Sequence, residues 1–396
     1  MASVLVFLTY LAVILLIGLL TSILSQKFRI PNILLLLLIG IGLGRIEYRG
    51  GPLVYFPELF LTGISVLALV MIVFDSASRF KLKRFDYFSL HVLWLSIVFL
   101  VFNLIFLTIF TMLIFDIKSI FLGVIFAALM SGTDPAAVLS MLKNVKNNVF
   151  EFLELEALLN TPLVVLLPFI ILDLKRALKD ELVISTFIEQ LAPLLQQFVV
   201  GIGSGVLVGL IMFKFMRRQY SVVLSPLAVV TSALLAYIIA ENMGGNGVLA
   251  VTSMGLLFGN VYLKQKFQLQ EFASVFSNSL EILVFVLIGI MIAIPFSFEF
   301  FIKSIMLFIF YLLIRFSAIM FSLRGMNFTF KEKVFMSLNV QKGIAVAVVV
   351  FSFTTLGIEG IQTILNLALA FMLYSIILST FALRMEKFFV SGLENK

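Results

Sequence analysis

Residues 119–142 read SIFLGVIFAALMSGTDPAAVLSML, an apolar stretch long enough to span a membrane but interrupted at its centre by SGTDP at 131–135. Pro135 has no amide hydrogen and disfavours helix at the preceding residue, and Gly132 loosens the turn before it. We therefore expect a broken helix with Asp134 beside the unwound stretch.

Such a stretch carries the chemistry of a hard-cation site. An unwound helix presents main-chain carbonyl oxygens, and Thr133 and Asp134 add side-chain oxygens without sulfur or imidazole. The alternative is structural, a proline kink in which Asp134 caps the second half of the helix. The two interpretations are compatible, because the start of a half-helix is itself used to bind ions in transporters.

The rest of the chain is apolar almost throughout. Hydrophobic residues make up 62% and charged residues 12% of its 396 positions, the latter about half the share of a soluble domain, and the mean hydropathy is +1.18. Stretches 3–24 and 90–115 contain no charged residue and exceed the roughly 18 residues that a span needs. The first lacks the basic start and cleavage site of a signal peptide, so we expect it to remain as a span.

Apolar windows and their polar breaks predict about thirteen spans. They are 3–24, 33–45, 58–75, 88–115, 119–142, 151–172, 191–216, 221–240, 244–262, 275–294, 299–322, 333–354 and 362–390. Because apolar runs of roughly 18 or more residues are long enough to cross the hydrocarbon as helices, the predicted fold is an all-α polytopic membrane protein.

Lysine and arginine indicate the orientation of these spans. Of the 28 basic residues, 19 follow odd-numbered spans or lie in the C-terminal tail, and 7 follow even-numbered spans. Basic loops stay in the cytoplasm. We therefore expect a multi-pass protein of the cell membrane, with its N-terminus outside and its C-terminus in the cytoplasm.

The two halves of the chain share an order of features. The second span contains GIGLG at 40–44 and the ninth GLLFG at 255–259, and the fifth and twelfth spans are interrupted at 131–135 and 341–343. Small residues four apart let helices approach closely. Spans 1–6 then correspond to spans 8–13, with span 7 as the connector. Because corresponding spans are seven apart, an odd number, each span of the second half crosses the membrane in the direction opposite to its counterpart. Inverted six-helix repeats with broken, crossed helices are typical of secondary transporters.

Ionisable side chains inside the spans are the next candidates, because charges in the bilayer normally have partners or line a cavity. Glu156 and Asn160 lie four residues apart, on one helix face. Lys342 and Arg315 are the two cations inside spans. Arg315 must be paired or hydrated, whereas Lys342 can serve as an ion-pair partner or can titrate.

Two further carboxylates are secondary candidates for the ion path. Asp75 ends the third span four residues before Arg79, and Glu281 opens the tenth. The simpler interpretation makes Asp75 a helix-end partner of Arg79 and Glu281 an interfacial residue.

The composition excludes several classes of chemistry. The chain has no cysteine and one histidine, His91, so disulfides and sites built on cysteine or several histidines are excluded. It contains none of the GxSxG, HExxH or P-loop motifs. The net charge of +7 reflects basic loops between spans rather than a nucleic-acid surface. We expect neither an enzyme nor a bound cofactor, and the bilayer as the principal partner.

Several motifs resemble a known family. TDPAAVL at 133–139 followed by EALLN at 156–160 is similar to the monovalent cation/proton antiporter superfamily, and within it to sodium/proton exchangers of the prokaryotic NhaP type. The resemblance continues in order through GVLAV at 247–251, Gly255, Gly259-Asn260, FVLIG at 285–289, Arg315 and Lys342-Gly343.

The resemblance implies a homodimer with two kinds of domain. Residues 1–87 and 221–298 would form the dimerisation domain. Residues 88–190 and 299–396 would form the core that translocates the ion, and 191–220 the connecting helix.

The resemblance also implies an ion site. Thr133, Asp134, Asn160 and Thr161 would surround the cation, and Glu156 would pair with the basic residue of the second crossing helix, here Lys342. The ligands of the monovalent cation would be Thr133, Asp134 and Asn160.

Two positions depart from the family pattern. Thr161 stands where an aspartate is expected to bind cation and proton, and Lys342 stands where an arginine is usual. Threonine can ligate a cation but cannot exchange a proton near neutral pH. The leading hypothesis is exchange of a monovalent cation, sodium first, for protons by alternating access, with Asp134 or Glu156 titrating. The alternative is an antiporter-fold protein without proton exchange, such as a uniporter, a channel-like conduit or a sensor.

Overall fold

The computed structural model describes residues 2–28, 31–48, 51–52, 54, 56–80, 87–133, 148–178, 184–218, 221, 224–261, 265–292, 295 and 297–390. This part of the chain is helical except for its connections and one antiparallel hairpin, in which β1 (Glu47–Tyr48) pairs with β2 (Gly51–Pro52).

The described residues before position 184 contain seven α-helices. They are α1 (Ala2–Phe28), α2 (Asn32–Gly44), α3 (Glu58–Arg79), α4 (Tyr87–Phe102), α5 (Thr108–Phe115), α6 (Ile120–Met130) and α8 (Asn148–Leu178). A π-helical turn, Asn103–Leu107, joins α4 to α5 without ending the helix.

The remaining described helices begin with α9 (Ile184–Arg218), which contains most of the predicted connecting segment 191–220. They continue as α10 (Leu224–Asn242), α11 (Gly247–Asn260), α12 (Lys266–Met291), α13 (Phe298–Ser322), α14 (Phe330–Leu338), α15 (Ile344–Thr354), α16 (Ile361–Arg384) and α17 (Glu386–Phe389).

Each predicted span coincides with a helix or a helical segment, which confirms the membrane fold. Within the described residues, eight helices are long and apolar enough to cross a bilayer, and four apolar helices are shorter. Span 12 is broken as predicted, into α14 and α15. The first half of span 5 is α6, which ends at Met130, and the rest of that span lies outside the described residues.

Helix lengths support the internal repeat. The second and ninth spans, α2 and α11, are 13 and 14 residues long, and α6 and α15, from the fifth and twelfth spans, have 11 residues each. At 1.5 Å per residue, none of these four helices reaches across roughly 30 Å of hydrocarbon. They are short in matching places, as an inverted repeat requires.

The paired glycines bring helices from the two halves together. A Cβ atom built at Gly40 would lie 2.4 Å from the carbonyl oxygen of Val286 on α12. A Cβ atom at Gly259 would lie 2.6 Å from the carbonyl oxygen of Ser78 on α3. The sequence predicted close approach, and the structure shows that α2 packs on α12 and α11 on α3. In both pairs, a helix of one half packs against a helix of the other half.

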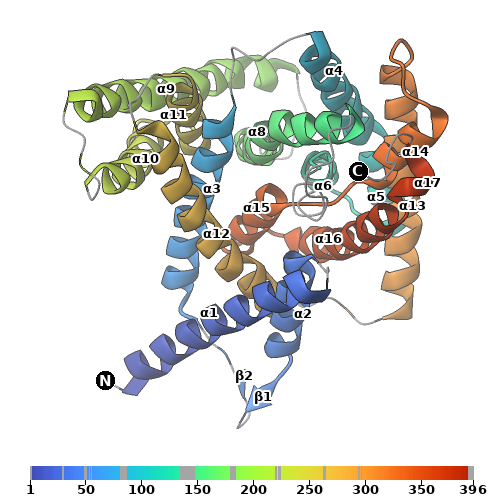
Figure 1. The fold of residues 1–396 in the computed structure, drawn as a ribbon, viewed down its shortest axis with the longest axis horizontal. Coiled ribbons are helices and arrows are strands. Elements are labelled where there is room, and N and C mark those ends of the chain that lie inside the picture. The colour runs from blue at the N-terminus through green and yellow to red at the C-terminus, as the bar shows by residue number, and fades with distance from the viewer. Residues whose placement is uncertain are drawn as a thin grey trace.

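Two groups of helices lie on either side of α6, α8 and α15 (Figure 1). One group contains α3, α9, α10, α11 and α12, and the other contains α4, α5, α13, α14 and α16, while α6, α8 and α15 lie in the middle of the view. The hydrophobic side chains of α6 and α15 are almost all buried. The interrupted helices therefore occupy the centre of the molecule.

Candidate functional site

The break in span 12 places a lysine at the centre of the fold. Residues 339–343 between α14 and α15 are not helical, and the Lys342 side chain is fully buried. Its Nζ donates hydrogen bonds to the carbonyl oxygens of Met130 and Gly132, both at 2.6 Å, and to the hydroxyl of Tyr311 at 2.5 Å. Lys342 therefore links the two broken spans.

This arrangement uses the full donor capacity of the ammonium group. A lysine has three N–H donors, and three oxygens accept them. One of these oxygens, that of Met130, ends α6, and the other, that of Gly132, lies in the non-helical stretch that follows. Carbonyls at the end of a helix lack intrahelical partners, and the helix dipole gives negative potential there. Lys342 is thus stabilised by main-chain oxygens, in the manner of an oxygen-bound monovalent cation.

The expected pair between Lys342 and Glu156 is wrong, because Glu156 pairs with Arg315 instead. The two Nη atoms of Arg315 on α13 contact the two carboxylate oxygens of Glu156 on α8 at 2.5 and 2.7 Å. Both side chains are fully buried. The planar guanidinium matches a carboxylate in a bidentate geometry that an ammonium cannot provide.

One face of α13 carries Arg315 and also Tyr311, whose hydroxyl accepts a hydrogen bond from Lys342. Tyr311 lies one helical turn before Arg315, so the two side chains share a face. The Arg315 guanidinium lies over the Phe99 ring of α4, 4.7 Å from its centroid, and the Phe99 and Tyr311 rings are 5.8 Å apart. Sequence reasoning missed Tyr311. Its spacing of four residues from Arg315 was the available signal.

Asn160 lies on α8 next to the end of the first broken helix. Its Nδ2 donates to the Thr133 hydroxyl at 2.9 Å, and both side chains are buried. These two predicted ligands are therefore brought together. Thr161 follows within α8, but its side chain lies outside the described residues, as does Asp134.

A second polar contact holds the end of α6 from the side of span 4. Asn103, in the π-helical turn, donates from Nδ2 to the Ser131 hydroxyl at 3.2 Å. Ser131 in turn donates to the Ala127 carbonyl at 2.8 Å. π-Helical turns are frequent at functional sites, and this one ties α4 to the unwound stretch. Sequence reasoning did not single out Asn103.

Several buried polar atoms near the breaks have no hydrogen-bond partner in the described part of the chain. They are Asn103 Oδ1, Asn160 Oδ1, Arg315 Nε, Asn339 Oδ1, Gln341 Nε2 and Gln341 Oε1. An unsatisfied buried group costs about 1–3 kcal/mol. These atoms lie on the elements around residues 131–133 and 339–343, so the meeting of the broken spans retains unused hydrogen-bonding capacity.

The secondary candidates lie elsewhere. Asp75 pairs with Arg79, Nη2 to Oδ2 at 2.8 Å, and accepts a hydrogen bond from the Ser274 hydroxyl of α12 at 2.9 Å. The helix-end interpretation of Asp75 is therefore confirmed. Glu281 is partly buried on α12. Neither takes part in the hydrogen bonds that join Lys342, Thr133 or Asn160 to their neighbours.

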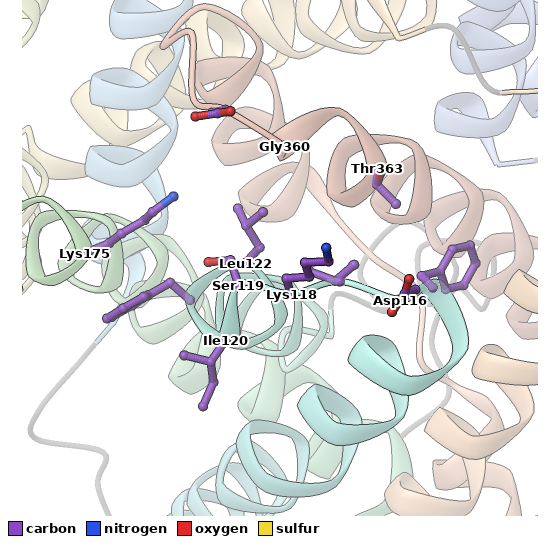
Figure 2. A pocket seen from close by; sticks show the side chains of 12 residues that line it. Asp116, Lys118, Ser119, Ile120, Leu122, Lys175, Gly360 and Thr363 are labelled. Atoms are coloured by element: carbon purple, nitrogen blue, oxygen red, sulfur yellow. The ribbon is translucent and has the colours of Figure 1, made fainter. Parts of the chain in front are cut away.

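A cavity of about 550 Å³ lies at the opposite end of α6 from Lys342. It is lined by residues 115–122, Lys175, Glu359, Gly360 and Thr363. Figure 2 shows Lys118 and Lys175 with their amino groups toward this space, opposite Gly360 and Thr363. The cavity is separate from the cluster around the breaks, because the 11 residues of α6 lie between them.

Two half-length helices that meet at buried charges, within an inverted repeat, define the class of secondary transporters. The sequence profile of the sodium/hydrogen exchanger, transmembrane, family matches residues 11–385. The chain belongs to this family and has the fold of a multi-pass membrane protein.

Curated relatives are similar over part of their length. The chain is 28% identical over 299 residues to the Na(+)/H(+) antiporter ApNhaP of Aphanothece halophytica, covering 72% of this chain and 54% of that protein. It is 27% identical over 251 residues to the K(+)/H(+) antiporter NhaP2 of Shewanella sp. (strain ANA-3), covering 62% and 42%. The chain thus spans about half the length of these two relatives. Its match to the probable Na(+)/H(+) antiporter 2 of Methanocaldococcus jannaschii is 26% identical over 318 residues and covers 74% of this chain and 71% of that protein.

A solved structure shares the fold. The sodium proton antiporter MjNhaP1 from Methanocaldococcus jannaschii at pH 8 matches with a TM-score of 0.77 and 20% identity, covering 96% of this chain and 100% of the other. At this identity the likeness establishes the architecture of the helices.

Proposed function

We propose that this protein exchanges a monovalent cation, sodium first, for protons by alternating access. The observation that carries the proposal is the buried meeting of the broken spans, where Lys342 binds the oxygens at the end of α6 and Asn160 binds Thr133. Relatives that carry the names of Na(+)/H(+) and K(+)/H(+) antiporters support it.

The contacts of Glu156 narrow the choice of titrating group. Both carboxylate oxygens of Glu156 are engaged by the two guanidinium Nη atoms of Arg315, so they are not open to a transported cation. We therefore assign proton exchange to Asp134, which the sequence places directly after Thr133. One carboxylate that holds either a proton or a cation couples the two fluxes by competition.

The same proposal includes the architecture and the orientation. Residues 1–87 and 221–298 form a dimerisation domain of a homodimer, 88–190 and 299–396 form the moving core, and 191–220 connect them. The packing of α2 on α12 and of α3 on α11 supports the first domain as a unit. The 19 to 7 split of basic residues supports a cytoplasmic C-terminus in the cell membrane. A reporter fused after Lys396 that is active only outside would contradict this orientation.

The test measures cation flux and internal pH together in sealed proteoliposomes. We expect a sodium or potassium gradient to move protons in the wild type, and Asp134→Asn to abolish proton movement. Thr161→Asp should increase it, because a carboxylate there adds a second group whose proton and cation compete. Cation flux without any pH change would refute the exchange and favour a uniporter or a conduit. Thr161 is the residue that motivates this alternative, because threonine cannot exchange a proton near neutral pH.

A further inference from the structure

Gln341 lies in the break of span 12, directly before Lys342. Its side chain is fully buried, and neither Oε1 nor Nε2 has a hydrogen-bond partner in the part of the chain that the structure describes. The two polar residues beside it differ. Lys342 uses all three donors, and Asn339 Nδ2 donates to the Phe335 carbonyl at 2.8 Å. In Gln341, both the amide oxygen and the amide nitrogen therefore lack a hydrogen bond among the described residues, whereas Asn339 lacks one at its oxygen alone.

The residue after Gln341 in the chain contacts the other broken span. The neighbouring Lys342 binds the carbonyl oxygen of Gly132, which is followed in the chain by Thr133. Thr133 accepts from Asn160, whose Oδ1 is buried and without a partner among the described residues. Two neutral amide oxygens, one from the break in span 12 and one from α8, are therefore buried and without a partner among the described residues.

Amide oxygens are ligands for hard cations, and they carry no charge. A neutral oxygen contributes to cation binding without adding a group that exchanges protons. Because buried amides are nearly always hydrogen-bonded, an unsatisfied one at the centre of the fold has the capacity to bind a ligand that is not part of the chain.

We propose that the Gln341 carboxamide is a ligand of the transported monovalent cation, with Asn160 Oδ1 as a second neutral oxygen. This inference rests on the proposed cation transport. The proposal gives the break of span 12 two roles: Gln341 binds the cation directly, and Lys342 supplies a positive charge.

The first test needs no transport. Thermal unfolding of the purified protein in detergent is measured in sodium chloride, potassium chloride and choline chloride. A cation that binds the folded state raises the unfolding temperature, so we expect sodium or potassium to stabilise the wild type relative to choline. Gln341→Met, which keeps the length of the side chain and removes both amide atoms, should lose this shift. Gln341→Glu, which keeps an oxygen, should retain it.

Gln362→Met is the matched control. Gln362 begins α16 outside the breaks, and its Nε2 donates to Asn366 Oδ1 at 3.0 Å. The same chemical substitution there should leave the cation-dependent shift unchanged. Because Gln341→Met removes an amide without a partner, its unfolding temperature in choline should be no lower than that of the wild type.

The second test is the half-saturating cation concentration for transport in proteoliposomes. Loss of one ligand should raise it about tenfold for Gln341→Met and leave it unchanged for Gln362→Met. Equal values for the two variants, with equal stabilisation by sodium, would overturn the role of Gln341 even if exchange is observed. If the wild type neither moves protons nor is stabilised by cations, both proposals are wrong. Cation stabilisation that depends on Gln341, without proton movement, refutes exchange alone.

Discussion

At the scale of single residues, the buried contact between Glu156 and Arg315 determines the electrostatics of the centre. Each charge would be unstable alone in this apolar setting, and together they form a neutral, bidentate unit. That unit leaves Lys342 without a carboxylate partner among its described hydrogen bonds, all of which go to uncharged oxygens.

We predict that Glu156→Gln destabilises the protein strongly, because Arg315 would keep a buried charge without its counter-ion. Removing one member of such a pair typically costs about 3–5 kcal/mol. Chemical or thermal unfolding in detergent would measure the loss. Adding Arg315→Met should recover much of it, since no charge then remains unpaired.

A surface pair provides the control for this prediction. Lys303 and Glu299 on α13 are 2.5 Å apart, yet their side chains are 40% and 74% exposed. Water solvates either partner alone, so Glu299→Gln should leave unfolding unchanged. If the double variant Glu156→Gln with Arg315→Met is as unstable as the sum of the single variants, the two residues do not act as a pair.

At the scale of helices, close packing at glycine positions decides which elements touch. Gly40, Gly42 and Gly44 all lie in α2, but they face different surroundings. A Cβ atom at Gly40 or Gly44 would meet the α12 backbone at 2.4 or 2.7 Å, whereas at Gly42 nothing lies within 4 Å.

We predict that Gly40→Ala destabilises the packing of α2 on α12 by about 1–3 kcal/mol, because two backbones must separate to admit the methyl group. Gly42→Ala is the matched control and should be neutral or slightly stabilising, since alanine favours helix. Thermal unfolding of the two variants compares them directly. Equal effects at both positions would show that helix propensity rather than packing is responsible.

The small-residue pairs show which helix contacts the sequence could predict. Spacing predicted that the second and ninth spans contact another helix closely, and this is confirmed. It did not identify α12 and α3 as the partners, because a glycine pair specifies a smooth surface and not the helix that covers it.

At the scale of the whole molecule, α15 links the broken span to the first group of helices. The Ser65 hydroxyl of α3 donates to the Ser352 hydroxyl of α15 at 2.9 Å, and both residues are buried. Thr354, at the end of α15, contacts the Met291 sulfur of α12 at 3.8 Å. Both contacts lie at the end of the bundle where even-numbered spans terminate. Alternating access between the proposed domains requires them to separate.

We predict that a cross-link between these helices stops transport. The chain contains no cysteine, so Ser65→Cys with Ser352→Cys introduces the sole pair of thiols. Oxidation should join them and block cation flux in proteoliposomes, and a reductant should restore it.

Each single cysteine variant should remain active under oxidation, which controls for damage by the oxidant. Full transport by the completely cross-linked protein would show that α3 and α15 do not move apart during the cycle.

The sequence by itself determined that the chain lies in lipid, that it is helical, and where the fifth and twelfth spans are interrupted. Few charges and long apolar stretches require lipid, lipid requires helices, and glycine and proline at 131–135 interrupt one of them. These are local properties, which each segment carries wherever it packs. The tertiary structure alone decided that Glu156 meets Arg315, that Lys342 meets carbonyls, and that Tyr311 joins them. Such choices depend on the rotation and depth of helices far apart in the chain, and an apolar helix with one charge gives no local signal of which partner will face it.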